Sequence, residues 1–162
     1  MDNRVVVSNT TPLIALAWLK RLDLLPALFG NIHIPQAVYD EIVHNPEAIG
    51  AAELQAVSWL IISPVKDTLA VSLLLDQLDA GESEAIVLAR ELQAGLLLMD
   101  ERRGRRRAMQ ANLNVVGTLG ILIQARRQNM TGLLRPQLDR LRQLPFRMSE
   151  QLYQDVLKRV DE

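Results

Sequence analysis

Four oxygen-bearing side chains stand where the sequence could place them for chemistry on a phosphate. Asn9 and Asp100 each follow a short apolar run of strand length, whereas Glu41 and Glu84 lie in helical segments beside apolar positions. Clustered carboxylates repel one another unless a cation neutralises them. Hard divalent cations such as Mg²⁺ prefer oxygen ligands. Such an ion lowers the pKa of water and stabilises charge on a phosphoryl group. If the four residues converge, the pattern therefore indicates metal-assisted hydrolysis of a phosphate ester.

Each of these residues also has a purely structural interpretation. Asp100 could cap the helix that follows its strand, and Asn9 could be a turn residue, because its side chain tolerates turn conformations. Glu41 and Glu84 could be solvated surface residues at the edge of an apolar helix face.

The elements that must position these residues alternate along the chain. Runs rich in aliphatic residues predict strands, and the segments between them have helical spacing. The predicted strands cover residues 4–8, 31–34, 59–62, 96–99 and 114–117, with helices between and after them. Strands separated by helices pair in parallel, with both sheet faces covered. We therefore expect a three-layer α/β/α sandwich with a central, mostly parallel sheet. Ligands bind at the carboxyl ends of such strands, which directs attention to Asn9, Asp100 and Thr118.

Several helix starts are visible as capping signals. Thr11 followed by Pro12 resembles an N-cap and a first helical position. Asp79 and Glu82 have the spacing of a capping box. Ser149 is expected to cap the last helix, and helix capping is the favoured role for Thr118.

Five segments together resemble a known family. They are VVSNTTPLI (6–14), IPQAVYDEI (34–42), DAGESEAI (79–86), LLLMDERR (96–103) and VVGTLGIL (115–122). In order and spacing they resemble PIN-domain proteins, and more closely a bacterial branch related to the ribonuclease toxins of toxin–antitoxin pairs. The resemblance implies an α/β/α sandwich and a ribonuclease that needs Mg²⁺ or Mn²⁺. It also implies RNA and a small antitoxin protein as partners, and a homodimer.

The resemblance also implies a catalytic and metal-binding set. The four acidic positions of the family correspond to Asn9, Glu41, Glu84 and Asp100, and Glu82 is an alternative for the third. Glu84 is preferred because Glu-Ala-Ile matches the family pattern and Glu82 already has a capping role.

The first of these positions departs from the family, which has Asp where this chain has Asn9. An amide offers a carbonyl oxygen but no charge. The departure favours an alternative function, a catalytically weak module that binds an antitoxin or RNA.

Three hydroxyl residues accompany this set. Ser8, Thr10 and Thr118 could hydrogen-bond the scissile phosphate or the ligands, with turn formation and capping as the alternatives.

Five arginines follow Asp100 almost without interruption. Arg102, Arg103 and Arg106 are candidates for nucleic-acid contacts, and the cluster also contains Arg105 and Arg107. Arginine binds phosphate bidentately, and several such contacts make binding salt-dependent. A solvated helix face and the docking of an acidic partner segment are the alternatives.

Composition excludes several other classes of function. The 162-residue chain has no cysteine, which excludes thiolate nucleophiles and thiolate metal sites. Its aromatic content of 4% is too low for a base-stacking platform, and its net charge of −1 excludes an overall basic polyanion binder. No apolar run approaches the ~18 residues that span a bilayer. We expect a cytoplasmic protein without membrane association. Residues 1–162 are expected to form a single domain, with 132–162 a C-terminal helical pair packed on it.

Overall fold

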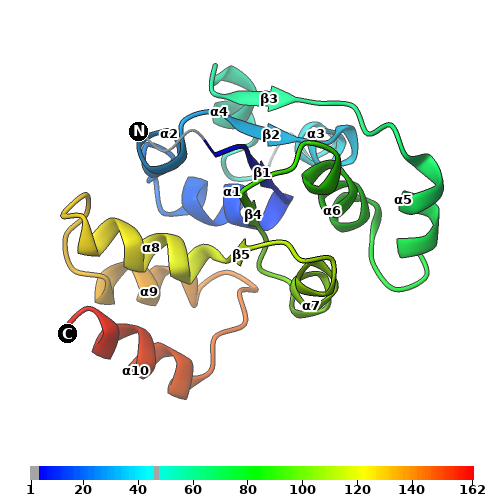
Figure 1. Ribbon diagram of the computed structural model, residues 1–162. Coiled ribbons are helices and arrows are strands. Elements are labelled where there is room, and N and C mark those ends of the chain that lie inside the picture. Colours follow the sequence, from blue (N-terminus) through cyan, green and yellow to red (C-terminus); the bar gives the residue numbers. More distant parts are fainter. Residues whose placement is uncertain (1–3, 46–47) are drawn as a thin grey trace.

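Five parallel strands form the centre of the molecule, in the order β3-β2-β1-β4-β5 (Figure 1). The computed structural model describes residues 4–45 and 48–162. The strands are β1 (Val6–Ser8), β2 (Ile32–Ile34), β3 (Leu60–Ile62), β4 (Leu96–Leu98) and β5 (Val115–Val116). Each coincides with a predicted strand and is shorter than the apolar run that predicted it.

Helices cover both faces of this sheet. Within the described residues they are α1 (Thr10–Trp18), α2 (Leu24–Phe29), α3 (Gln36–Val43), α4 (Ala51–Ala56), α5 (Thr68–Leu74), α6 (Ala80–Glu91), α7 (Arg102–Gln110), α8 (Thr118–Arg127), α9 (Arg135–Leu141) and α10 (Glu150–Arg159). The predicted α/β/α sandwich is confirmed, and its sheet is wholly parallel.

Alternation along the strands divides the core into two parts. Val6, Leu96 and Leu98 belong to a large cluster with residues of α1, α2, α8, α9 and α10. Val7 and Leu97 point to the opposite face and belong to a smaller cluster with α6 and α7. Successive side chains of a strand face opposite sides of a sheet, so both sides of β1 and β4 are buried. These two central strands therefore hold the ends that carry Asn9 and Asp100 in fixed positions.

The two C-terminal helices lie beneath α8 in the view of Figure 1. Leu138 of α9 and Val156 of α10 are buried in the same cluster as Val6. Trp18 Nε1 donates to the Arg140 carbonyl oxygen at 3.0 Å, and Arg140 Nη2 donates to the Trp18 carbonyl oxygen at 3.0 Å. This reciprocal pair joins α1 to α9.

Two predicted caps are confirmed and two are wrong. The Asp79–Glu82 capping box is present at the start of α6, and Ser149 Oγ accepts from Leu152 N at the start of α10. Thr11 is not a cap, because α1 already begins at Thr10. Thr118 is not a cap either, because Gly117 precedes α8 and the Thr118 hydroxyl binds elsewhere. In the described part of the chain, no helix is long and apolar enough to cross a membrane.

Candidate active site at the carboxyl ends of the strands

Asn9 is held at the end of β1 by its own backbone. Its N–H donates to the Leu98 carbonyl oxygen at 2.9 Å, and its carbonyl oxygen accepts from Ser8 Oγ at 2.8 Å. Asn9 is 5% exposed, and its side chain makes no capping hydrogen bond to α1. The amide is therefore fixed between the central strands without being committed to the helix that follows.

Gly81 brings the start of α6 directly against this residue. A Cβ atom at position 81 would overlap Glu41 Oε1 and lie 3.3 Å from Asn9 Oδ1. A larger residue would displace the Glu41 carboxylate, so the glycine leaves room for it there. The side-chain oxygens of Asn9 and Glu41 both lie beside Gly81, although the residues come from different elements.

Glu41 and Glu84 connect α3 to its neighbours at this point. Thr10 Oγ1 donates to Glu41 Oε2 at 2.5 Å, and the Ala37 N–H in the first turn of α3 donates to Glu84 Oε1 at 3.3 Å. Each carboxylate thus has one protein donor and retains further lone pairs for another ligand.

Two of the acidic residues have raised pKa values, first because they are partly buried and then because other carboxylates lie nearby. Burial raises the pKa of Glu41, and the charges of Asp79 and Glu84 raise it further, against the lowering effect of the Thr10 hydrogen bond. Burial also raises the pKa of Glu82, with contributions from Asp79, Glu101 and Glu41. Neighbouring carboxylates thus add to burial in disfavouring the ionisation of Glu41 and Glu82, which is the condition that a cation relieves.

Asp100 occupies the adjoining strand end with different partners. Thr118 donates to it twice, from its backbone N–H to Oδ1 at 2.7 Å and from Oγ1 to Oδ2 at 2.6 Å. Burial raises the pKa of Asp100, although the Thr118 hydrogen bonds and the Arg105 charge lower it. Asp100 therefore holds the first residue of α8. It does not cap α7, the helix that follows its own strand, because the residue directly before α7 is Glu101.

Arg105 and Gly117 complete the surroundings of Asp100. A Cβ atom at position 117 would lie 2.6 Å from Arg105 Nη1 and 2.8 Å from Asp100 Oδ1, and Arg105 Nη1 donates to the Met99 carbonyl oxygen at 3.3 Å. A half-buried guanidinium thus lies beside the carboxylate, held by a backbone oxygen.

The predicted residues come together in two adjoining groups. Asn9, Glu41 and Glu84 gather where α3 and α6 meet the end of β1. Asp100 lies at the end of β4, the neighbour of β1, where Ser8 pairs with Leu98. Among residues 4–45 and 48–162, no three His, Asp or Glu side chains are grouped closely enough to hold a metal ion as they stand. The side-chain donors of both groups are nevertheless all oxygens, three carboxylates and one amide carbonyl, and a hard divalent ion prefers oxygen ligands.

Three residues beside these groups were not predicted as part of the site. Asp79 was recognised only as a helix cap, yet its charge acts on both Glu41 and Glu82. Glu101 acts on Glu82 and Asp100, and so links the two groups. Its position directly after Asp100 was the available signal. Arg105 could not be separated by sequence from the other arginines of its run.

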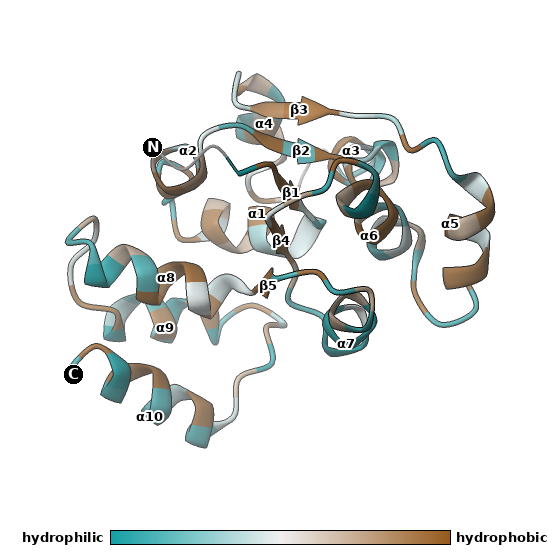
Figure 2. Ribbon diagram, viewed as in Figure 1, coloured by the Kyte–Doolittle hydropathy of each residue, from teal (hydrophilic) through white to brown (hydrophobic). Residues whose placement is uncertain are grey.

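The remaining predicted residues have clear positions. Ser8 is fully buried and supports the Asn9 backbone, and Thr10 donates to Glu41. Arg102, Arg103 and Arg106 are exposed on α7, which begins two residues after Asp100 and is strongly hydrophilic in Figure 2.

A family model described as PIN domain, DUF3368, matches residues 5–162. The chain is a PIN-domain protein. The match covers almost the whole sequence, including both helices after α8. No curated protein matches the chain. A PIN domain has a nuclease-type fold, and such domains generally use divalent metal ions and commonly bind RNA. The acidic groups at the strand ends of this PIN domain are therefore its candidate active site.

Proposed function

We propose that this PIN domain is a metal-dependent endoribonuclease that hydrolyses phosphodiester bonds in single-stranded RNA. The observation that carries the proposal is that Asn9 and Glu41 both lie against Gly81, with the Glu84 charge close to Glu41, one strand away from Asp100. Burial raises the pKa values of Glu41 and Asp100, and neighbouring carboxylates raise them further, which is negative charge that a cation would compensate.

The residues divide into three roles under this proposal. Asp100 and Glu84 would be the main ligands of Mg²⁺ or Mn²⁺, with Glu41 and the Asn9 carbonyl oxygen completing the set. When bound, the ion would stabilise charge on the phosphate and lower the pKa of water. Thr118 fixes both oxygens of Asp100, and Thr10 orients Glu41. Glu82 is the alternative third ligand, although its carboxylate accepts from Asp79 N in the capping box.

Exposed arginines on α7 suit the RNA backbone in this proposal. Arg102, Arg103 and Arg106 follow Asp100 within two turns of helix, so phosphates held by them would lie near the acidic groups. Arg106 is one helical turn from both Arg102 and Arg103, so the three share one side of α7 and can contact neighbouring phosphates of a flexible strand.

We further propose that the protein is the toxin of a toxin–antitoxin pair. It would act in the cytoplasm as a homodimer and be held inactive by a small antitoxin protein. Residues 1–162 would form one domain, with 132–162 its C-terminal helical pair. Burial of Leu138 and Val156 in the main core supports that last point.

A second function is favoured by one specific observation. Asn9 replaces the family's first carboxylate, which leaves the site with one formal negative charge fewer. A PIN domain with a weakened metal site would bind RNA or an antitoxin and cleave little.

One gel separates the two functions. Labelled single-stranded RNA is incubated with the protein in Mn²⁺ or in chelator, beside Asp100→Asn, Glu84→Gln and the matched control Glu53→Gln on α4, which is exposed. The nuclease proposal requires cleavage that chelator and the first two substitutions abolish and the control preserves. Cleavage that survives chelator and Asp100→Asn contradicts it. RNA retention without cleavage supports the binding module.

A further inference from the structure

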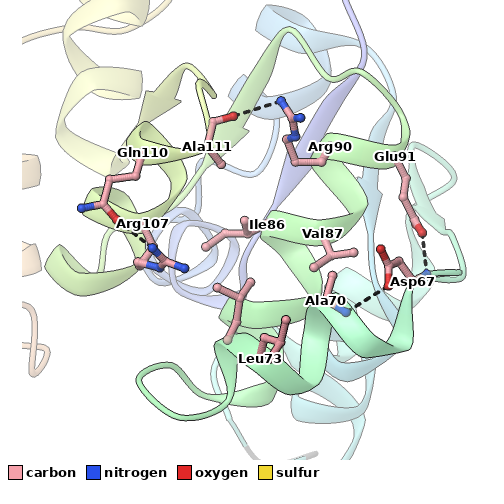
Figure 3. Close-up of a pocket in the computed structure, with 11 residues that line it drawn as sticks. Asp67, Ala70, Leu73, Ile86, Val87, Arg90, Glu91, Arg107, Gln110 and Ala111 are labelled. Atoms are coloured by element: carbon pink, nitrogen blue, oxygen red, sulfur yellow. Dashed lines mark hydrogen bonds between the residues drawn. The ribbon is translucent and has the colours of Figure 1, made fainter.

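A groove runs between α5, α6 and α7, on the side of the sheet away from the main core. It has a volume of about 390 Å³, and its floor contains Leu73, Leu74, Ile86 and Val87. Figure 3 shows the side chains of Leu73, Ile86 and Val87 directed into it from two facing helices. An apolar floor of this kind accepts aliphatic side chains.

The helix that forms one wall is itself poorly covered. None of the described residues of α5 is buried, and Leu69 and Leu73 are 69% and 68% exposed. Exposed leucines contiguous with an apolar groove are typical of a surface that another molecule covers.

A strongly basic cavity adjoins the groove at its α7 end. It has a volume of about 570 Å³, and Arg107 and Gln110 line both cavities. Arg103, Arg106 and Arg107 contribute three guanidinium groups, against one carboxylate from Asp76. In the part of the chain that the structure describes, none of these guanidinium groups pairs with a carboxylate. The cavity therefore attracts negative charge.

Two carboxylates, Asp67 and Glu91, line the opposite end of the groove, and Arg90 lines it between the two ends, where its Nη1 donates to the Ala111 carbonyl oxygen at 3.1 Å. Glu91 accepts from Lys66 N and Asp67 N at 2.8 Å each, and Asp67 accepts from Ala70 N at 3.0 Å. In Figure 3, Asp67 and Glu91 lie across the groove from Arg107 and Gln110. The groove is thus polar along its length, which gives any occupant a preferred direction.

We propose that this groove docks a helical peptide segment of a partner protein, with two aliphatic side chains on the α5–α6 floor and carboxylates on the α7 arginines. Amphipathic helices bind such grooves through aliphatic side chains that lie one helical turn apart on the same face. Nucleic acid suits the apolar floor poorly, since a phosphate backbone offers nothing to fill it. A second copy of this chain docked through the same face would bring the arginines of two α7 helices together.

Docking has a consequence that rests on the proposed function. Arg103 and Arg106 are also proposed RNA contacts, so the bound segment and RNA would compete for them.

Chemical-shift mapping locates the binding surface without RNA, metal or activity. The ¹⁵N-labelled protein is titrated in chelator with a short peptide that carries two leucines four residues apart, followed by glutamates. A matched peptide has lysines in place of the glutamates. The proposal expects shifts at Leu73, Val87 and Gln110 with the first peptide and none with the second. Shifts elsewhere, equal shifts with both peptides or no shifts overturn it, and none of these outcomes bears on RNA cleavage.

Surface substitutions test the two halves of the groove separately. Leu73→Ser and Arg107→Glu alter exposed side chains and should each weaken peptide binding about tenfold. Leu133→Ser and Arg159→Glu alter exposed side chains remote from the groove and should leave it unchanged. Equal affinity of all four variants overturns the proposal. Light scattering in which Leu73→Ser converts a dimer to a monomer, with peptide affinity unchanged, assigns the leucines to a second copy and also overturns it.

Discussion

The side-chain amide of Asn9 is the group in which the proposed metal site departs from an all-carboxylate set. It is almost fully buried between Glu41 and the end of β4. A carboxylate there would add a formal charge at a position where water cannot screen it well. Under the proposed function, the absence of that charge would limit the affinity of the remaining acids for a divalent ion.

Asn9→Asp should therefore tighten Mn²⁺ binding. We expect a gain of about tenfold, the scale on which single groups around a metal change affinity. Titration calorimetry measures the affinity. The control is Asn31→Asp, which changes an exposed residue directly before the amino end of β2, whereas Asn9 follows the carboxyl end of β1. Unchanged affinity in Asn9→Asp would remove position 9 from the site.

Glu41 should make the metal-free protein less stable as the pH rises. Burial and the neighbouring Asp79 and Glu84 charges raise its folded pKa, so the folded state binds the proton more tightly than the unfolded chain does. Its stabilising contribution is complete below the unfolded value of about 4.3 and is lost as the pH rises through the higher folded pKa.

Glu41→Gln keeps an oxygen for Thr10 and removes the charge. In chelator, its melting temperature should exceed that of the unmodified protein at pH 7, and the difference should shrink towards pH 4. Glu53→Gln is the control, because Glu53 is exposed on α4. If the melting temperatures of Glu41→Gln and the unmodified protein differ by the same amount at pH 7 and at pH 4, the Glu41 charge is not the cause of the difference.

At the scale of elements, the sequence pattern predicted where the strands and a helix start lie, but it did not predict the side-chain contacts that join different elements. The five strands and the capping box of α6 depend on local sequence, and all were visible. Thr118 was misread because its partner, Asp100, is 18 residues away and becomes adjacent only when β4 and β5 pair. The closeness of Glu41 to Asn9 likewise depends on the missing side chain of Gly81, which no single-helix pattern reveals.

Glu162 shows how one side chain can fix two elements. Its carboxylate accepts from Leu134 N at 2.8 Å and Arg135 N at 3.0 Å, at the start of α9, and pairs with Arg126 of α8 at 3.3 Å. Its side chain is 6% exposed, so these contacts are shielded from water.

Glu162→Gln should cost about 1–3 kcal/mol of unfolding free energy, the range for buried hydrogen bonds to a charged group. Despite burial, the Leu134, Arg135 and Arg126 contacts lower the pKa of Glu162, so its contribution is present above the unfolded value of about 4.3. It is lost as the pH falls through the folded pKa. Urea unfolding at pH 7 and at pH 3 measures both effects, with Glu53→Gln at an exposed position of α4 as the control. If Glu162→Gln lowers the unfolding free energy by the same amount at both pH values, the stabilising contribution does not depend on an ionised Glu162 carboxylate.

At the scale of the whole molecule, positive and negative charges lie in separate regions although the net charge is close to zero. The net charge is −1, yet α7 carries five arginines within six positions, directly after the acidic strand ends. A nearly neutral protein gains little from long-range attraction to a polyanion, so the proposed RNA binding would depend on a few local phosphate contacts. The slope of the logarithm of the affinity against the logarithm of the salt concentration depends on the number of such contacts.

Reversing Arg102 and Arg106 to Glu should lower RNA affinity and flatten its dependence on salt. Removing one phosphate interaction reduces the slope of log K against log salt by about 0.7 for a single strand, because fewer counterions are released. Filter binding with non-cleaved RNA in chelator, at several salt concentrations, measures affinity and slope together. Arg127→Glu with Arg159→Glu changes the net charge equally on exposed residues of α8 and α10. If both double variants lose affinity to the same extent, the effect belongs to total charge and α7 is not the RNA-binding helix. If only the α7 variant flattens the slope, the phosphates lie on the helix that begins beside Asp100.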